Sequence, residues 1–357
     1  MRVRRLWLTD FRNLAHAELD LPAGLTAVVG DNGQGKTNLL EAIGYLAQLE
    51  SFRGAPTEAL VRTGTSPAVV RAEVERDERE LLIEAEIAPG RSRVQVNRQR
   101  LARTRDLLGA LRVTVFAPDD LEMVKGGPVT RRRYLDDLLV AHSPKLDVLR
   151  TDLDRILKQR NALLKQMAGR HGGGEGALAT LEVWDERLAT TGSALVAARA
   201  ALLDQLRPAL QVAYAHVAGA PADVGAAYEQ SWEGDLADAL RDVRDVDVRR
   251  AVTTVGPHRD ELALTIDGRV ARTHASQGEQ RSVALAMRLA GHEVVAQEIG
   301  ASPVLLLDDV FSELDPTRSA ALLAHVPRGQ VLLTTAGGLP EDAHPELVVH
   351  VRHGHLS

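Results

Sequence analysis

Hydrophobic positions in the first third of the chain follow a strand period, interrupted by one helical run. Alternating apolar residues over 3–9 and 17–21 predict a short antiparallel pair, and the run 24–29 predicts a buried strand. A helix is expected over 36–49, after a glycine-rich turn. Three further alternating stretches between 68 and 101 predict a β meander, and the segment 112–121 predicts one more strand with a turn near Pro118.

After about residue 119 the periodicity becomes helical. Apolar residues recur at heptad-like spacing over 149–167, with Arg160 interrupting one position, and again over 181–206. The glycine-rich stretch 169–176 separates the two runs, so we expect an antiparallel helical hairpin with a tip there. Its first limb would be about 36 Å long at ~1.5 Å per residue. The pattern fits a bundle packed flat on the core as well as a projecting arm.

From about residue 252, strands and helices alternate again. Helices are expected over 277–299 and 318–326, and buried strands over 303–307 and 330–334. This βαβ rhythm is typical of a parallel sheet covered on both faces. The sequence therefore predicts an α/β fold, in which residues 1–118 and 255–357 form a head with a mixed sheet and residues 119–254 form a helical insertion.

The clearest chemical motif lies between the strand that ends at Val29 and the next helix. It matches G-x-x-x-x-G-K-[ST] at every fixed position, with the residues Gly30, Asp31, Asn32, Gly33, Gln34, Gly35, Lys36 and Thr37. Its glycines let backbone N–H groups cradle phosphate oxygens at a helix N-terminus. Lys36 is expected to reach the β- and γ-phosphates, and Thr37 to ligate Mg²⁺.

Two carboxylates follow the buried strand 304–307. Asp308 and Asp309 stand at its carboxyl end, where α/β folds bind ligands. Asp308 is predicted to bind Mg²⁺ together with Thr37, and Asp309 to orient or deprotonate an attacking water. Upstream, Ser276 precedes Glu279 by three residues; this spacing fits a structural capping box and also an anion site at a helix start.

Together these motifs resemble the ATP-binding-cassette (ABC) heads of the SMC/RecF type. The resemblance is greatest to the RecF family and covers the stretches 8–14, 30–43, 116–136, 256–262, 276–281 and 305–315. It implies an ABC-type P-loop ATPase head that binds ATP with Mg²⁺. It also implies a homodimer in which the signature of one copy closes on the nucleotide of the other. The signature would be Ser276, Gln277, Gly278, Glu279 and Gln280, and the D-loop Ser312, Glu313, Leu314 and Asp315.

The RecF resemblance further implies an ATP-dependent DNA-binding protein of recombinational repair and replication-fork maintenance. Such proteins act with RecR and RecO to help RecA load at gapped or single-stranded/duplex DNA, as a normal SOS response requires. Their ATPase is weak and serves as a switch. This chain has Gln277 in place of the first signature glycine, Asp309 in place of a common glutamate, and no histidine at the end of the strand 330–334. We therefore expect slow hydrolysis.

Charge restricts where DNA could bind. The 357 residues include 43 Lys and Arg against 49 Asp and Glu, a net charge of −6, so a uniformly basic coat is excluded and contacts must be local. Two basic stretches are candidates for contacts to the DNA backbone. They contain Arg91, Arg93, Arg98 and Arg100, and Lys125, Arg131, Arg132 and Arg133. Ordinary solvated charge remains the alternative for each residue, and Asp136 and Asp137 could neutralise the second stretch.

Other functional classes fit less well. The absence of cysteine excludes thiol catalysis and Cys-ligated metals, and 3% aromatic residues argue against base-stacking platforms. No apolar run suggests a signal peptide or a membrane span, so a cytoplasmic protein is expected, and the RecF resemblance implies that it is nucleoid-associated. An SMC-like chromosome-tethering ATPase is the alternative, but the insertion is too short for its long arm. A transporter subunit or a small-molecule kinase would not explain the spacing and identity of the SQGEQ motif.

Overall fold

The computed structural model describes residues 1–76, 79–169, 175–219, 221–312 and 314–357. Contacts divide the chain into two compact units, each built from separate segments. Unit 1 comprises residues 1–121, 209–222 and 281–357, and unit 2 comprises residues 122–208 and 223–280. Throughout the described ranges, no helix combines the length and the apolar character needed to cross a bilayer.

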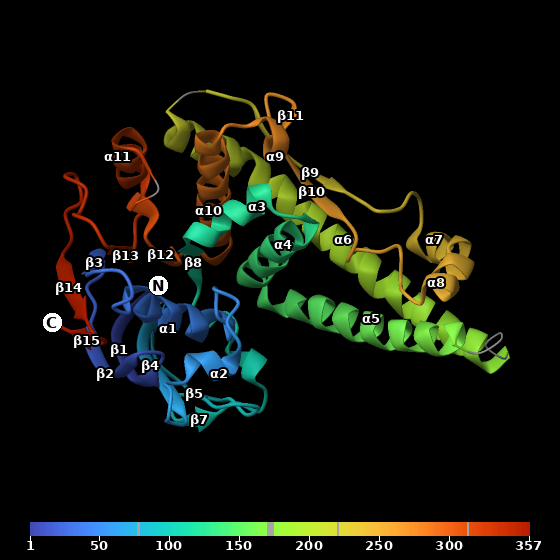
Figure 1. Ribbon diagram of the computed structural model, residues 1–357, viewed down its shortest axis with the longest axis horizontal. Helices are drawn as coiled ribbons and strands as arrows, with labels where there is room; N and C mark the ends of the chain where they lie inside the picture. Colours follow the sequence, from blue (N-terminus) through green and yellow to red (C-terminus); the bar gives the residue numbers. More distant parts are fainter. Residues whose placement is uncertain (77–78, 170–174, 220, 313) are drawn as a thin grey trace. The chain divides into compact units, whose positions relative to one another are not determined.

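A six-stranded sheet with the order β15-β14-β3-β13-β12-β8 lies in unit 1 (Figure 1). All its neighbouring strands are parallel except β14 and β15. The strands are β3 (Leu25–Val29), β8 (Val113–Phe116), β12 (Val304–Leu307), β13 (Val331–Thr335), β14 (Leu347–Arg352) and β15 (His355–Leu356). Every residue of β12 and β13 is buried, as expected for short apolar runs covered on both faces. Because β3, β12 and β13 are parallel, their carboxyl ends meet at one edge.

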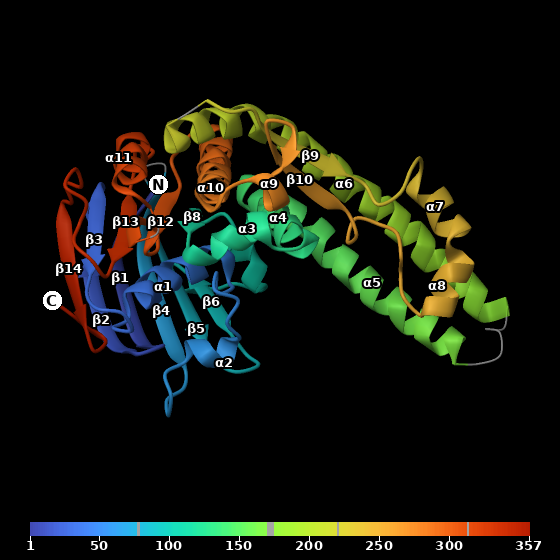
Figure 2. The same cartoon turned by 45° about the horizontal axis from the view of Figure 1, so that its top comes forward.

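The second sheet of unit 1 is antiparallel and has the order β2-β1-β4-β5-β6-β7. Figure 2 shows its first strands side by side. The strands are β1 (Arg2–Phe11), β2 (Leu14–Asp20), β4 (Ala68–Arg76), β5 (Arg79–Ile87), β6 (Arg93–Val96) and β7 (Gln99–Arg100). Buried and more exposed positions alternate along β4. Strands β4, β5, β6 and β7 pair antiparallel in chain order, which confirms the predicted meander.

Helix α1 (Lys36–Gln48) contacts strands of both sheets, and ten of its thirteen residues are buried. A helix that is buried on most sides needs apolar residues all around it, which the sequence of α1 supplies. The other elements that lie wholly in unit 1 are α2 (Thr57–Leu60), α11 (Pro316–His325) and the 3₁₀ turns η1 (Thr104–Leu107), η2 (Pro118–Leu121) and η4 (Val310–Ser312). Unit 1 also contains the end of α6 and most of α10, and the remaining part of each of these helices belongs to unit 2.

Unit 2 contains the predicted helical hairpin, formed by α5 (Asp147–Ala168) and α6 (Glu175–Ala218) (Figure 1). Leu164 and Met167 of α5 pack against Leu181 of α6. Of the predicted tip, residues 170–174 lie outside the described residues. The other elements are α3 (Glu122–Lys125), α4 (Pro128–His142), η3 (Pro144–Leu146), β9 (Val224–Glu229), α7 (Leu236–Asp242), α8 (Arg244–Arg250), β10 (Glu261–Ile266), β11 (Arg269–Val270), α9 (Ala271–His274) and the start of α10 (Gln277–Ile299).

Arg160 interrupts the apolar face of α5 because it is the centre of a buried ionic cluster. Its side chain is fully buried and donates to Asp185 on α6 over 2.8 Å and to Asp247 on α8 over 2.7 Å. A third bond, of 2.9 Å, reaches the hydroxyl of Thr253. Arg160 therefore ties three helical segments of unit 2 together, and two carboxylates compensate its buried charge.

The two units are divided differently from the predicted head (1–118 and 255–357) and insertion (119–254). Residues 255–280 group with unit 2, because β10 pairs with β9 over the full length of both strands. Residues 209–222 group with unit 1, where His216 stacks on His325 with ring centroids 4.0 Å apart. The chain therefore passes between the units four times, whereas the predicted organisation requires two passages.

Candidate functional site

The glycine-rich loop occupies residues 30–35, between the end of β3 and the start of α1, as the sequence predicts. Gly30 and Gly35 have φ angles of 154° and 116°, in the region that favours glycine. Side chains are excluded by space as well, since a Cβ at Gly30 would lie 2.3 Å from the carbonyl oxygen of Val351. Gly30 is thus required by the close approach of the backbone, and Gly35 by its φ angle and the nearby side chain of Asn13.

Lys36 lies at the first position of α1, and its side chain folds back over the loop. The residue is 6% exposed, and Nζ donates to the carbonyl oxygens of Gly30 over 2.8 Å and Asp31 over 2.9 Å. The ammonium group is therefore held inside the turn whose N–H groups and helix N-terminus favour anions.

Two segments outside the motif support the loop through Gln34. The side chain of Asn13 donates to the Gln34 carbonyl over 2.8 Å and accepts from Asn38 of α1 over 2.7 Å. From the β14–β15 turn, the backbone N–H of Gly354 donates to the same carbonyl over 3.1 Å, and that of His353 donates to Oε1 of Gln34 over 2.6 Å. No feature of the sequence indicated these contacts, although the stretch 8–14 contributed to the family resemblance.

The predicted pair Thr37 and Asp308 is brought together at the same edge. The Thr37 hydroxyl donates to Oδ1 of Asp308 over 2.8 Å, and a second hydroxyl, that of Thr334 on β13, donates to the same oxygen over 2.7 Å. Burial raises the pKa of the Asp308 carboxyl, and the bonds from Thr334 and Thr37 act in the opposite direction. Thr334 is therefore a member of the site that the sequence motifs did not reveal.

Asp309 follows with a φ of 50°, a left-handed conformation that aspartate adopts more readily than most residues. Its Oδ1 is buried and has no hydrogen-bond partner among the described residues. The backbone N–H of Asp309 donates to the Thr334 hydroxyl over 2.9 Å. The site thus contains a buried carboxylate oxygen whose hydrogen-bonding capacity is not used by the described residues.

This set of groups fits a hard cation such as Mg²⁺, which prefers oxygen ligands and is usually shared with substrate phosphates. Thr37 and Asp308 supply a hydroxyl and a carboxylate, with Asp309 beside them. In the described ranges, no cluster of three or more His, Cys, Asp or Glu side chains is placed to hold a metal alone. A cation here would therefore depend on oxygens of a bound nucleotide.

The SQGEQ segment of unit 2 forms the start of α10. The Ser276 hydroxyl accepts from the backbone N–H of Glu279 over 3.3 Å, and the Glu279 carboxylate accepts from the N–H of Ser276 over 2.7 Å. This reciprocal pair is a capping box. Ser276 and Gln277 are exposed, whereas Gln280 is buried and donates to two carbonyls of α9. The segment is thus capped structurally while its first residues remain accessible.

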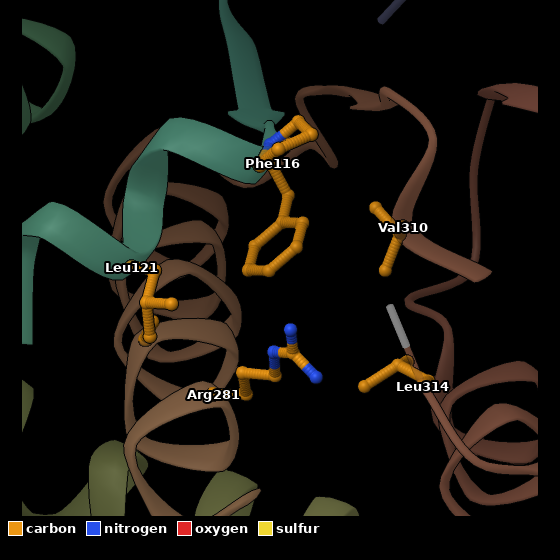
Figure 3. Close-up of a pocket in the computed structure, with 7 residues that line it drawn as sticks. Phe116, Leu121, Arg281, Val310 and Leu314 are labelled. Carbon is orange, nitrogen blue, oxygen red and sulfur yellow. The ribbon is translucent and has the colours of Figure 1, made fainter. Parts of the chain in front are cut away.

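After Asp309 the chain turns through the predicted D-loop. Ser312 donates to the carbonyl of Asp309 over 2.8 Å, and Asp315 caps α11 by accepting from the N–H of Arg318 over 2.9 Å. Glu313 lies outside the described residues. Leu314 faces an apolar pocket in unit 1, into which the guanidinium of Arg281 also points (Figure 3). The other residues that line the pocket are Phe116, Pro118, Leu121, Ala284 and Val310.

The candidate DNA-binding residues fall into two structural classes. In the first stretch, Arg91, Arg98 and Arg100 are exposed, and Arg93 lies 3.4 Å from Glu86. Arg98 occupies the β6–β7 turn and Arg100 lies on β7, the edge strand of the antiparallel sheet. This edge is therefore an accessible basic surface.

The second stretch is mostly committed to contacts inside unit 2. Arg131 is 6% exposed and pairs with Glu261 through two bonds of 2.7 Å. Arg132 donates to the carbonyl of Asp260 over 2.6 Å, and burial lowers its pKa. Arg133 is exposed, and Lys125 is partly exposed. Of these four residues, Arg133 is the most accessible to a nucleic acid.

These contacts join two of the stretches that carry the family resemblance, 116–136 and 256–262. Asp260 accepts from the Tyr228 hydroxyl over 2.6 Å, and Arg199 pairs with Asp136 while donating to the carbonyl of Pro257 over 2.9 Å. Burial lowers the pKa of His258 to about 4, so that it is neutral at pH 7. Arg131 and Arg132 thus hold the segment 260–261 in place.

Comparisons with known proteins agree with this geometry. The model of the RecF/RecN/SMC N terminal domain family matches residues 2–335. Two proteins called DNA replication and repair protein RecF, from Frankia alni and Streptomyces avermitilis, are 48% and 45% identical to this chain; each match covers 94% of this chain and 93% of the relative.

Solved structures give the same result. The structure of the recombination mediator protein RecF-ATP in the RecFOR pathway is 30% identical, has a TM-score of 0.91 and covers 99% of this chain and 96% of its own. An Smc head domain from Pyrococcus furiosus, 18% identical with a TM-score of 0.57, covers 99% of this chain and 94% of its own and shows a similar fold. The chain therefore belongs to the RecF family, within the wider group of RecF, RecN and SMC heads.

Proposed function

We propose that this protein is an ATP-dependent DNA-binding protein of DNA replication and recombinational repair. The observation that supports the proposal most directly is the meeting of the glycine-rich loop, Thr37, Asp308 and Asp309 at one edge of the parallel sheet. The relatives that match nearly the whole chain are named for DNA replication and repair, and one was solved with ATP.

ATP would bind with its phosphates on the loop 30–37. Loop N–H groups and the N-terminus of α1 stabilise negative charge, and the Lys36 ammonium exchanges its carbonyl partners for phosphate oxygens. Thr37 and Asp308 would hold Mg²⁺, which supplies charge neutralisation on the phosphates. Asp309, with its unpartnered Oδ1, accepts a hydrogen bond from the attacking water and orients it.

We further propose that ATP drives a two-fold homodimer in which Ser276–Gln280 of one copy closes on the nucleotide of the other. Two features support this: Ser276 is exposed, and it stands at the N-terminus of a long helix, which favours an anion. The capping box holds the segment in shape before the partner arrives. Hydrolysis is expected to be slow, because Asp309 is shorter than glutamate and no histidine stands directly after β13.

DNA would bind to the basic surface of the β6–β7 edge, through Arg98 and Arg100, and Arg91 in the β5–β6 connection is a further candidate. Arginines on an edge strand and its turn contact phosphates rather than bases, so binding is expected to be tolerant of sequence and sensitive to salt. The protein partners in this proposal are RecR, together with RecO, and RecA downstream at gapped DNA.

The test is sedimentation velocity of the full chain with ATP, with ADP and without nucleotide, each in the presence and absence of gapped, single-stranded and duplex DNA. Among the nucleotide conditions, we expect a dimer only with ATP and Mg²⁺. DNA binding should be tighter in that dimeric state. A sedimentation coefficient and a DNA affinity that are the same under all nucleotide conditions would exclude the ATP switch.

A further inference from the structure

Thr334 stands beside both acidic residues of the site. Leu307 of β12 pairs with Leu333 of β13, so the next residue on each strand, Asp308 and Thr334, are neighbours at the carboxyl edge. Thr334 is fully buried. Its hydroxyl donates to Oδ1 of Asp308 over 2.7 Å and accepts from the N–H of Asp309 over 2.9 Å.

The direction of these bonds is fixed. A hydroxyl has a single proton, and a carboxylate can only accept, so the Thr334 proton must lie on the Asp308 side. The bonds therefore run from the N–H of Asp309 through the hydroxyl to the carboxylate, and each polarises the next. One side chain thus sets the orientation of the Asp308 carboxylate and holds the backbone of Asp309 in its left-handed conformation.

The other hydroxyl on Asp308, that of Thr37, bonds to this carboxylate and not to Asp309 among the described residues. Thr37 belongs to the phosphate loop, and its oxygen is the ligand that Mg²⁺ would take in the proposed site. Coordination would use a lone pair of the Thr37 oxygen and leave its proton hydrogen-bonded to Asp308. Thr334 lies on β13, outside the loop, and it alone of the two hydroxyls bonds to both Asp308 and the N–H of Asp309.

We propose that Thr334 is a positioning residue for the metal–nucleotide complex, which keeps Asp308 and Asp309 aligned while Thr37 binds the cation. This inference rests on the proposed nucleotide-binding function. It assigns a role to a residue that lies outside every motif recognised in the sequence.

The experiment compares Thr334→Val, Thr334→Ser and the control Thr335→Val. Valine preserves the branched shape without the hydroxyl, and serine restores the hydroxyl. Thr335 is the next buried residue of β13, and its hydroxyl bonds only to the backbone of Gly337 among the described residues. The affinity of each protein for a fluorescent ADP analogue is measured in EDTA and in Mg²⁺, and the ratio gives the gain due to the metal.

We expect Thr334→Val to bind the analogue in EDTA with the affinity of the wild type. Its gain in affinity on addition of Mg²⁺ should be about tenfold smaller than that of the wild type, a magnitude typical of losing a residue that hydrogen-bonds to a metal ligand. Thr334→Ser and Thr335→Val should keep the gain. An unchanged gain in Thr334→Val, or an equal loss in Thr335→Val, would overturn the inference.

Folding is checked by circular dichroism, and Thr334→Ala replaces the valine variant if that variant does not fold. Loss of folding in both would assign Thr334 a purely structural role and would also overturn the inference. Wild-type protein that binds no nucleotide in either buffer would instead overturn the proposed function, which is a distinct result.

Discussion

The guanidinium of Arg131 makes a two-point ion pair with the carboxylate of Glu261, with both nitrogen–oxygen distances at 2.7 Å. The remaining nitrogen donates to the carbonyl of Gly126 over 2.8 Å. An arginine with these partners stabilises unit 2, and we do not include it in the proposed DNA surface. The two basic stretches therefore call for different experiments.

Replacing Arg131 with alanine should lower the free energy of unfolding by about 2 kcal/mol, because a buried guanidinium with several hydrogen bonds is lost and the partly buried Glu261 carboxylate loses its cation. Denaturant unfolding followed by circular dichroism measures this change. Arg133→Ala is the control: its side chain is 52% exposed and should shift stability by about 0.5 kcal/mol or less. Similar losses in the two variants would contradict the internal role of Arg131.

Reversing the charge of both Arg98 and Arg100 to glutamate should weaken DNA binding without changing stability. If each arginine contacts one phosphate, the slope of log affinity against log salt should fall by about 0.9 per residue. Fluorescence anisotropy with duplex and gapped DNA across a salt series measures this slope. A matched reversal of Arg155 and Arg241, which are exposed in unit 2, should leave the slope unchanged. Equal effects of the two reversals would remove the β6–β7 edge as a specific surface.

Asn13→Ala should weaken ATP binding roughly fivefold to tenfold, because the Gln34 carbonyl and the Asn38 amide lose a hydrogen bond worth about 1 kcal/mol. Calorimetric titration with ATP and Mg²⁺ measures the affinity. Gly354→Ala should act in the same direction, since its Cβ would lie 2.4 Å from the carbonyl oxygen of Asn13. Wild-type affinity in both variants would show that this support is not needed for binding.

Asp309→Asn should retain ATP binding and stabilise the ATP-bound dimer, because an amide cannot accept a proton from water in the way that a carboxylate can. Lys36→Ala should abolish the dimer by removing the cation of the loop. Sedimentation of both variants with ATP distinguishes these outcomes. A dimer that decays as fast in Asp309→Asn as in the wild type would argue against the proposed role of Asp309.

Acid should destabilise the protein through His292 of α10, which is 1% exposed and lies 3.0 Å from the hydroxyls of Thr114 and Ser302. Burial lowers its pKa to about 4, whereas an unfolded histidine titrates near 6.5. Between these values the unfolded chain binds one more proton, so stability falls as the pH falls, by about 1.4 kcal/mol per pH unit.

Urea unfolding at pH 7, 6 and 5 tests this dependence. His292→Gln should reduce the slope of unfolding free energy against pH by the contribution of about one proton. His258, whose pKa is also about 4, should continue to contribute to that slope. His350→Gln, at an exposed position of β14, serves as the control and should follow the wild-type slope. An unaltered slope in His292→Gln would contradict the prediction.

Local patterns allowed much of the fold and the centre of the site to be predicted. The loop 30–37 with the strand before it, and Asp308 with the strand before it, are each one continuous stretch of sequence. The chemistry of each motif and its placement at a strand end can therefore be predicted together. Thr334 could not be found in this way, because its role depends on the register between β12 and β13. The contact between Gln34 and Gly354 joins segments more than 300 residues apart, and no local period encodes it.

The arginines show a different limit. In the sequence, Arg131, Arg132 and Arg133 are equivalent members of one basic run. On α4, each successive residue is rotated by about 100° around the axis, so neighbours face different surroundings. Arg131 is buried against Glu261, whereas Arg133 remains exposed. Composition identified the run, but only the helix and its neighbours determine which arginine can meet a ligand.

The position of β3 between β13 and β14 has a consequence for synthesis. The strand that leads into the phosphate loop is complete by Val29, yet its first partner begins at Val331. At about 5–20 residues per second, a ribosome would need roughly 15–60 s to make the intervening chain. During that interval the hydrophobic strand β3 lacks both strands that pair with it, so the nucleotide pocket forms late. The nascent chain is therefore exposed to chaperones and to misassembly for most of its translation.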